Sequence, residues 1–351
     1  MSVSYDRIAR DIAFTLEVKS PKVFECIFLN NGCLAMFGDK GRVKIVRGSN
    51  RFDERVRLGQ NSNVDHRDKH TAIATTFQNN VQTAYYGQAV CDGAVPVNLV
   101  EQDQNAGEFR IQSLADDALE ELMNTFPNKI AGAIMKATSG ASDPTSIVEE
   151  LQATAYGAQT RTTGGIARSS YPGTDPTAAW QTQYNSESAD LSAAAGIATF
   201  EKFIYTCSPG GSSINEMPDI GITRNGVLAR LSGGQDILRR YQVNEKMTNL
   251  GFNNFKLGSL TLYSDVNVVN SGYCYLINSN YARIQVLAGQ KTKQTGNVKT
   301  IGEGKASIPI QILEPVRVSD KLQYNILAYL VYNLTLGGLR NHGLKTGLTE
   351  S

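Results

Sequence analysis

The sequence has few of the features on which enzymes, secreted proteins and membrane proteins depend. It contains five cysteines and no Cys-x-x-Cys pair, so we expect reduced, mostly buried thiols in a cytosolic protein. No run approaches the roughly 18–20 apolar residues of a membrane-spanning helix, and the polar first residues do not resemble a signal peptide. We therefore expect no membrane partner, and synthesis and release in a reducing cytoplasm.

Charge and histidine are also scarce. Charged residues make up 19% of the chain and the net charge is +1. Near-neutrality argues against a dedicated nucleic-acid-binding protein, although a local basic face stays compatible with non-specific contact. With only three histidines, acid–base chemistry at neutral pH would rest mostly on carboxylates. Low charge together with 32 glycines suits a surface largely covered by copies of the same chain.

Motifs for catalysis or metal binding are absent or incomplete. Gly302–Lys305 (GEGK) lacks the upstream glycine of a phosphate-binding loop, and Ala306 replaces its Ser or Thr. No Gly-x-Ser-x-Gly elbow is present. The cluster Asp65–His70 has metal-chelating spacing, but Arg67 and Lys69 interleave with it, which favours a solvated charged loop that pairs with neighbours. We expect no enzymatic activity, cofactor or metal.

The first quarter of the chain contains an arm and a long hairpin. Residues 1–41 have apolar patches without a period, which is typical of an arm that packs on another body. Residues 42–90 show two strand-like alternations on either side of the polar stretch Gly59–His70. Because a two-stranded projection is marginally stable alone in water, this hairpin is expected to need a partner surface.

A long helix is predicted over residues 108–138. Apolar residues recur there at spacings of three and four, and the stripe includes Phe126, Ile130 and Ile134. Pro127 lies inside the pattern, where it removes a hydrogen bond and clashes one turn back. We therefore expect a bend near Thr125–Asn128.

The remaining chain predicts alternating helices and strands. Tyr324–Leu336 is apolar on both strand faces, which predicts a strand buried from both sides. The other predicted helices are Thr145–Ala155, Ser188–Tyr205 and Asn225–Tyr241, and the other predicted strands are Asp219–Thr223, Leu257–Tyr263, Tyr273–Asn278 and Arg283–Val286. The fold class is α+β.

Taken in order, these elements resemble the major capsid protein of tailed double-stranded DNA phages, the Hong Kong 97-type fold. The resemblance covers nearly the whole chain as an ordered set of short strings. These are GRVKIV at the start of the hairpin, Thr163–Arg168 (TGGIAR) before Trp180, Met217–Arg224 (MPDIGITR), Ser259–Asp265 (SLTLYSD), Tyr273–Asn280 (YCYLINSN) and the tail VYNLTLGGLRNHGLKTGL.

The resemblance implies a domain organisation for the chain. Residues 1–41 would be the N-terminal arm and 42–90 the extended loop. Residues 91–189 would form the peripheral domain, with 108–138 as its spine helix. Residues 190–304 would form the α/β axial domain, and 305–351 would return as strands of the peripheral domain.

The resemblance also implies a function. Subunits would assemble into hexamers and pentamers of an icosahedral shell around double-stranded DNA, with portal, scaffold and decoration proteins as further partners. The location would be the virion capsid, assembled in the host bacterial cytoplasm. The side chains that we expect at contacts between subunits are charged: Asp65, Arg67, Asp68 and Lys69 in the hairpin, and Arg230, Arg239 and Arg240 near one helix.

Two alternatives stay open from the sequence. An encapsulin-like compartment shell shares the fold but encloses cargo enzymes, so DNA content and particle size would separate it from a virion. A soluble α/β enzyme would run as a monomer in size exclusion. Arg230, Arg239 and Arg240 also fit an ordinary solvated helix face, and Lys69 fits an ion-pairing lysine better than a covalent cross-link.

Overall fold

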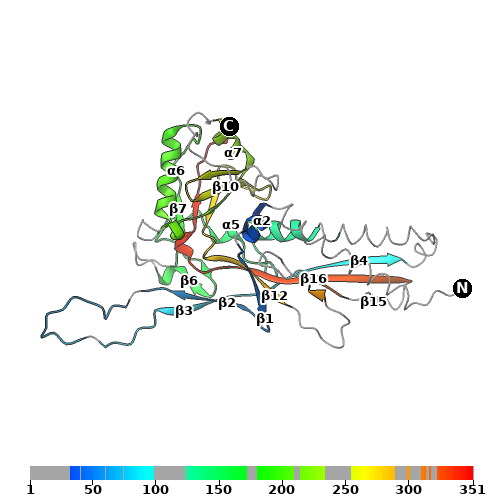
Figure 1. The fold of residues 1–351 in the computed structure, drawn as a ribbon, viewed down its shortest axis with the longest axis horizontal. Helices are drawn as coiled ribbons and strands as arrows, with labels where there is room; N and C mark the ends of the chain where they lie inside the picture. The colour runs from blue at the N-terminus through cyan, green and yellow to red at the C-terminus, as the bar shows by residue number, and fades with distance from the viewer. Residues whose placement is uncertain are drawn as a thin grey trace. The chain divides into compact units, whose positions relative to one another are not determined.

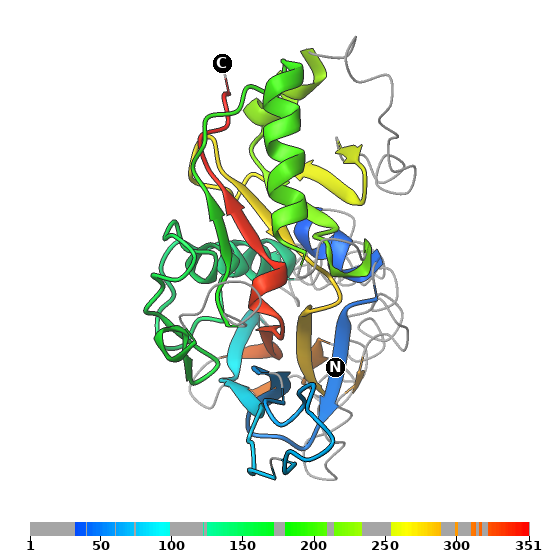
Figure 2. The same ribbon diagram turned by 90° about the vertical axis from the view of Figure 1, so that its left-hand side faces the viewer.

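Two units divide the chain in the computed structural model. Unit 1 comprises residues 1–50, 87–146 and 283–334, and unit 2 comprises residues 51–86, 147–282 and 335–351. Figures 1 and 2 show the ribbon from two directions. The structure describes residues 32–39, 41–59, 61–73, 75–98, 122, 125–171, 180–208, 214–233, 254–288, 299–300, 310–313, 316–317 and 322–350.

A seven-stranded sheet forms the framework of unit 1. Its order is β1-β12-β16-β14-β13, and β4 and β15 also pair with β16. β1 runs parallel to β12, whereas β4 pairs antiparallel with β16 over ten residue pairs, from Gln323–Asn98 to Tyr332–Ala89. The bounds are β1 Val43–Arg47, β4 Ala89–Asn98, β12 Ala282–Ala288, β13 Lys299–Thr300, β14 Gln311–Ile312, β15 Val316–Arg317 and β16 Gln323–Leu336.

The central strand β16 changes character along its length. From Gln323 to Tyr329 buried and half-buried residues alternate, and from Leu330 to Leu336 every residue is buried. The prediction of a strand buried from both sides is confirmed for the second half only. In the first half the second face, which carries Gln323, Asn325, Leu327 and Tyr329, is only half-buried.

Among the described residues of unit 1, the helical ones are those of α2, Gly32–Asp39, and residues 122 and 125–134. Phe126, Ile130 and Ile134 of the predicted stripe are buried. A Cβ at Gly93 of β4 would stand 2.6 Å from Leu122 Cδ1, so the missing side chain lets the helix lie close on the sheet. Pro127 is helical here, and the bend stays a prediction; residues 108–121 of the expected helix lie outside the described residues.

Unit 2 contains a six-stranded mixed sheet with the order β7-β17-β11-β8-β10-β9. β8 runs parallel to β10 and β17 parallel to β7, while the remaining pairs are antiparallel. The bounds are β7 Gln183–Asn185, β8 Ile220–Thr223, β9 Asn254–Leu257, β10 Leu260–Ser264, β11 Cys274–Ile277 and β17 Gly343–Lys345.

Two helices, α6 (Ala194–Thr206) and α7 (Asn225–Gly233), share one hydrophobic cluster with this sheet. Phe200 and Phe203 of α6 and Leu228 of α7 are among its buried members. A Cβ at Gly343 of β17 would lie 2.7 Å from Cys207 Sγ and 2.9 Å from Phe203 Cζ. Glycine at that position therefore allows the end of α6 to pack against β17.

Unit 2 also contains two further pairs of strands and several short helical segments. β2 (Phe52–Arg57) pairs antiparallel with β3 (Val81–Tyr86), and β5 (Thr162–Thr163) pairs with β6 (Ile166–Ala167). The remaining pieces are helix α5, Ile147–Glu150, and three 3₁₀ turns at Arg168–Ser170, Ile214–Glu216 and Leu339–Asn341. Within the described residues, every helix is too short or too polar to cross a membrane.

Several elements differ from their predicted bounds. The expected strand Leu257–Tyr263 is two antiparallel strands, because Gly258 takes φ +61° and turns the chain between Leu257 and Leu260. α5 is a single turn rather than a helix over Thr145–Ala155. α6 begins at Ala194 rather than Ser188, because Ala189 bridges to Leu348 and Asp190 forms a turn before the helix.

The expected domain organisation stays a prediction, and strand pairing between distant segments crosses its boundaries. The expected return segment 305–351 supplies β16 to the sheet of unit 1 and β17 to the sheet of unit 2. β12 lies within the expected axial segment 190–304 but pairs with β1 in unit 1. Residues 147–189, expected in the peripheral domain, belong to unit 2. Local sequence patterns do not encode these long-range pairings, which only the folded chain decides.

Candidate functional site

The hairpin of unit 2 has a paired base and an irregular outer part. The ladder joins Phe52–Tyr86 through Arg57–Val81, and the Leu58 N–H still donates to Asn80 O at 2.9 Å. Beyond that point the two limbs are joined by polar side chains. The Ser62 N–H donates to Gln78 Oε1 at 2.9 Å, and Asn63 Nδ2 donates to Thr76 O at 2.7 Å. The outer part is therefore held by amides rather than by a strand ladder (Figure 1).

The predicted contact residues of the hairpin lie at its tip. Arg67 Nη1 donates to Ala72 O at 2.6 Å, and Asp68 O accepts from the Thr71 N–H at 2.9 Å. Arg67 and Asp68 thus shape the tip itself, whereas Asp65 and Lys69 have exposed side chains. Their role at subunit contacts stays a prediction. Among the described residues, no group of three His, Cys, Asp or Glu side chains is placed to hold a metal ion.

Three large apolar side chains of the outer hairpin are open to solvent. Val64 is 81% exposed, Ile73 78% and Phe77 91%. Sequence reasoning placed Ile73 and Phe77 in a strand, but both lie outside the ladder, which begins on that limb at Val81. Scattered single apolar residues on a surface are ordinary. Here three large apolar side chains lie on the outer part of one hairpin, and the described residues leave all three uncovered.

A short β-turn fixes the base of the hairpin. β5 and β6 are joined by Gly164 and Gly165, which both have positive φ. Gly164 O accepts from the Tyr85 N–H at 2.8 Å, and a Cβ at Gly164 would lie 2.7 Å from the Ala84 Cβ. Only glycine combines this backbone conformation with this close approach. The string TGGIAR is therefore the segment that docks on β3.

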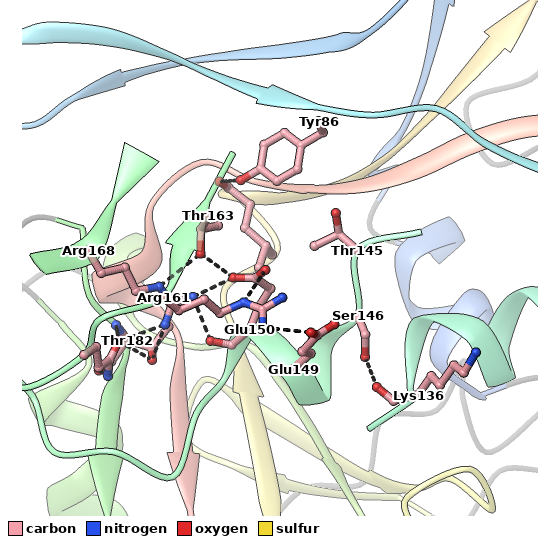
Figure 3. Close-up of polar contacts among 12 residues, drawn as sticks. Tyr86, Lys136, Thr145, Ser146, Glu149, Glu150, Arg161, Thr163, Arg168 and Thr182 are labelled. Carbon is pink, nitrogen blue, oxygen red and sulfur yellow. Dashed lines mark hydrogen bonds and ion pairs between the residues drawn. The ribbon is translucent and has the colours of Figure 1, made fainter. Parts of the chain in front are cut away.

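A buried ion pair lies beneath this turn. Arg168 is fully buried and Glu150 is 3% exposed, and Arg168 Nη2 meets Glu150 Oε2 at 2.6 Å. Arg161 Nε reaches Glu150 Oε1 at 3.1 Å, and Thr163 Oγ1 donates to Glu150 Oε2. Figure 3 shows Arg161, Arg168 and Thr163 converging on Glu150. We call these four side chains the anchor cluster.

The other N–H groups of Arg168 also have acceptors, and one of them on Nη1 faces Thr182 Oγ1 at 3.5 Å. Nη1 donates to Gln159 Oε1 at 2.8 Å, Nη2 to the Glu150 carbonyl at 2.8 Å and Nε to Thr163 Oγ1 at 3.0 Å. Burial lowers the pKa of Arg168, and the nearby Glu150 carboxylate opposes that shift. A buried guanidinium is tolerable only when paired and bonded in this way. The anchor cluster therefore specifies one position for the turn.

Tyr86 links the hairpin to the C-terminal chain of the same unit. Its hydroxyl donates to Leu336 O at 2.7 Å. Burial raises the pKa of Tyr86, and the negative charge of Glu150 raises it further. The phenol therefore stays protonated, as a donor, across physiological pH. Nothing in the sequence distinguished Glu150, Thr163 and Arg168 from ordinary polar residues. The string TGGIAR was the only signal that singled out this region.

The other predicted contact residue in the described chain is Arg230 on α7. Its Nε donates to Asp190 Oδ1 and its Nη2 donates to Asp190 Oδ2, both at 3.0 Å. The Arg230 guanidinium, together with hydrogen bonds from Ser192, holds the pKa of Asp190 below its usual range. Arg230 thus braces the turn before α6, and a contact with a neighbour stays a prediction. Arg239 and Arg240 lie outside the described residues.

The chain is similar to known proteins in fold and not in sequence. Neither a protein-family model nor a curated protein matches the chain by sequence. Solved capsid structures of a cyanophage and of a GTA particle, however, match it over nearly its whole length, so the chain has the fold of these capsid subunits. The resemblance drawn from the sequence is thereby confirmed at the level of the fold.

Three of these structures show the range of the likeness. The capsid asymmetric unit of cyanophage A-1(L) has a TM-score of 0.62 at 13% identity and covers 89% of this chain and 93% of its own. The capsid of an empty GTA particle has a TM-score of 0.55 at 10% identity, with 89% and 90% covered. A structure from Mycobacterium phage Bobi has a TM-score of 0.50 at 12% identity, with 90% and 91% covered.

Proposed function

We propose that this chain is the major capsid protein of a tailed phage. The observation that carries the proposal is the likeness to capsid subunits over about nine-tenths of the chain. Subunits would form the hexamers and pentamers of an icosahedral shell that encloses double-stranded DNA. Portal, scaffold and decoration proteins would be further partners, the virion capsid would be the location, and the host cytoplasm would be the place of assembly.

The hairpin supplies the mechanism of assembly. Its outer part presents the apolar side chains of Val64, Ile73 and Phe77, which its own limbs leave uncovered. Burying one such side chain against a neighbour stabilises the contact by about 1.5–3 kcal/mol. The anchor cluster and Gly164 hold the base, so the paired part of the hairpin loses little further conformational entropy when the outer part meets a neighbour. The structural role needs no catalytic centre.

Assembly of the purified protein tests this function. Electron microscopy is expected to reveal hollow particles, and deletion of Gly59–His70 is expected to leave folded subunits or capsomers without shells. A chain that stays monomeric at all concentrations, or that forms normal shells after the deletion, contradicts the proposal. Nucleic acid in particles from infected cells supports a virion, whereas protein cargo without DNA indicates an encapsulin-like compartment.

A point variant tests the contribution of one exposed apolar side chain of the hairpin, that of Phe77. Phe77→Ser should raise the protein concentration at which particles appear by about tenfold, because a loss of about 1.4 kcal/mol corresponds to that factor. Asn79→Ser is the matched control, since Asn79 is an exposed polar residue on the same limb. Light scattering measures the threshold, and equal thresholds for the two variants would show that Phe77 contacts no neighbour.

A further inference from the structure

The two-stranded base of the hairpin has one covered face and one exposed face. Figure 1 shows β2 and β3 side by side. The buried side chains of these strands are Phe52 and Val56 on β2 and Ala84 and Tyr86 on β3, and the Gly164 turn packs on the last two. Opposite residues of an antiparallel pair share a face. The other face, which we call the ribbon face, carries Asp53, Arg55, Arg57, Val81, Thr83 and Tyr85.

Two arginines of the ribbon face have no partner among the described residues. Arg55 and Arg57 are exposed, and no described residue forms an ion pair or a hydrogen bond with either side chain. An opposite charge directly across the ladder would stabilise such a residue. The residues across the ladder are Thr83 and Val81, which carry no charge. The positive charge of the two arginines is therefore not balanced by β3.

The one acid of the ribbon face is engaged by another arginine. Arg51 Nε lies 3.1 Å from Asp53 Oδ1, and the same guanidinium stands 3.9 Å from the centroid of the Tyr85 ring. At a strand rise of about 3.3 Å per residue, Arg55 and Arg57 stand about 6.6 Å apart along β2. Two like charges at that separation repel each other, so a partner that brings carboxylates to both is favoured.

The near-neutral net charge of the chain conceals two blocks of opposite sign. Residues 40–57 contain seven Lys or Arg and two Asp or Glu, whereas residues 101–121 contain seven Asp or Glu and one Arg. Residues 101–121, which we call the acidic block, lie outside the described residues, and their charge is a property of the sequence. The two blocks make one copy of the chain electrostatically complementary to another.

The apolar part of the ribbon face favours a protein segment over nucleic acid. Val81 is 49% exposed and Tyr85 45%, and both stand on the same face as the two arginines. A phosphate backbone gains nothing from a valine side chain, whereas a protein neighbour covers apolar and charged groups together. The Gly164 turn and the anchor cluster hold this face in place, which lowers the entropy cost of the contact.

We propose that in the assembled shell the ribbon face of one subunit binds the acidic block of a second copy. Carboxylates of that block pair with Arg55 and Arg57, and the same segment covers Val81 and Tyr85. The contact is heterologous, since two different surfaces meet, as a closed ring requires. The inference rests on the proposed capsid function and names a contact separate from the outer part of the hairpin.

Charge reversal on the two sides of the contact tests the proposal. The ribbon variant carries Arg55→Glu and Arg57→Glu. Its threshold concentration for particles, measured by light scattering, should rise about tenfold or more, because like charges then face each other. The melting temperature of the free subunit, measured by circular dichroism, should stay at the wild-type value. The neutral variant, with Arg55→Gln and Arg57→Gln, should also raise the threshold and make it less dependent on salt.

The acidic block is reversed in two separate pairs. It overlaps the helix predicted from the sequence over residues 108–138, in which residues four apart share a face. One variant therefore carries Asp116→Lys and Glu120→Lys, and the other carries Asp117→Lys and Glu121→Lys. At least one of them should raise the threshold about tenfold or more when it is assembled alone.

Mixing two variants shows whether the contact joins different copies. An equal mixture of the ribbon variant and the matching acidic-block variant should return the threshold toward the wild-type value, because each altered surface then meets its complement on the other chain. Lys202 and Arg224 are exposed residues of unit 2, so Lys202→Glu with Arg224→Glu is the matched control. A mixture of this control with the same acidic-block variant should not restore the wild-type threshold.

The outcomes separate this inference from the capsid function. Particles from wild type, without rescue in either mixture, overturn the inference and leave the capsid function standing. Lower melting temperatures for the single variants, restored when both changes are in one chain, mean that the acidic block binds the ribbon of its own subunit, which also overturns it. A short DNA duplex that binds wild type but not the ribbon variant, again without rescue, identifies a nucleic-acid surface instead. If wild type never assembles, both proposals fail.

Discussion

Glu150→Gln should destabilise unit 2 more than any other isosteric change in the anchor cluster. The substitution keeps the shape of the side chain and removes its charge. Arg168, which is fully buried, then has no anion within its shell of hydrogen bonds, because its other acceptors are neutral: Gln159 Oε1, Thr163 Oγ1, Thr182 Oγ1 and the Glu150 carbonyl. The desolvated guanidinium is left without a counter-charge.

The expected loss follows from the cost of an unpaired buried charge. Removing one partner of a buried ion pair costs about 3–5 kcal/mol of unfolding free energy. The amide oxygen of the replacement can still accept from Arg168, so we expect the lower end, about 3 kcal/mol. The neighbouring Glu149 is a matched control. It pairs with Arg161 Nη1 at 2.8 Å, and its side chain is 19% exposed, so Glu149→Gln should cost about 1 kcal/mol or less.

The single tryptophan of the sequence reports on this region. Trp180 is fully buried, and its Nε1 donates to Thr163 O at 3.3 Å. Urea unfolding followed by tryptophan fluorescence therefore measures the stability of the anchor, while circular dichroism follows the fold as a whole. Equal losses for Glu149→Gln and Glu150→Gln, or no loss for Glu150→Gln, would refute the argument from the buried charge.

Three further predictions follow from the glycine turn, a buried histidine and the charged hairpin. Gly164→Ala should lower the free energy of unfolding by about 2–4 kcal/mol, because alanine there adds left-handed backbone strain and overpacking against Ala84. Gly258 has a similar φ of +61° but open space around it, so Gly258→Ala should lower that free energy by the strain alone, about 1–2 kcal/mol. Urea unfolding of the two variants measures the difference. Burial lowers the pKa of His342 from 6.5 to about 3, so the unfolded chain binds the extra proton between those values and stability falls as pH drops below about 6.5. Between pH 7 and pH 5 His342 should account for about 2 kcal/mol, and His342→Asn should lose that part of the pH dependence in urea titrations. Raising sodium chloride from 0.1 to 1 M should lower the particle yield, measured by light scattering, before circular dichroism detects unfolding, because salt screens the exposed charges at the hairpin tip. If both signals are lost at the same salt concentration, these charges do not have the proposed role in assembly.

The candidate site was only partly visible in the sequence. The polar interruption Gly59–His70 predicted a hairpin that needs a neighbour, and the outer hairpin has no strand ladder to support it. The charged residues singled out for contacts were chosen for charge alone, and Arg67 and Arg230 turned out to bond within their own subunit. Phe77 was missed as a surface residue, since an apolar residue in an alternating pattern is ordinarily assigned to a buried strand face.

The local order of apolar residues determined which strands and helices form, and pairing between distant segments determined which sheet each strand joins. Strand β8, the buried half of β16 and the stripe on residues 126–134 follow from the order of apolar residues, because each element's periodicity is a local property. The anchor cluster does not, because Glu150 and Arg168 are 18 residues apart and meet only after the turn at Gly164 closes. The two oxygens of the buried Asp265 side chain also differ through packing: Asn267 donates to Oδ1, whereas none of the described residues donates to Oδ2.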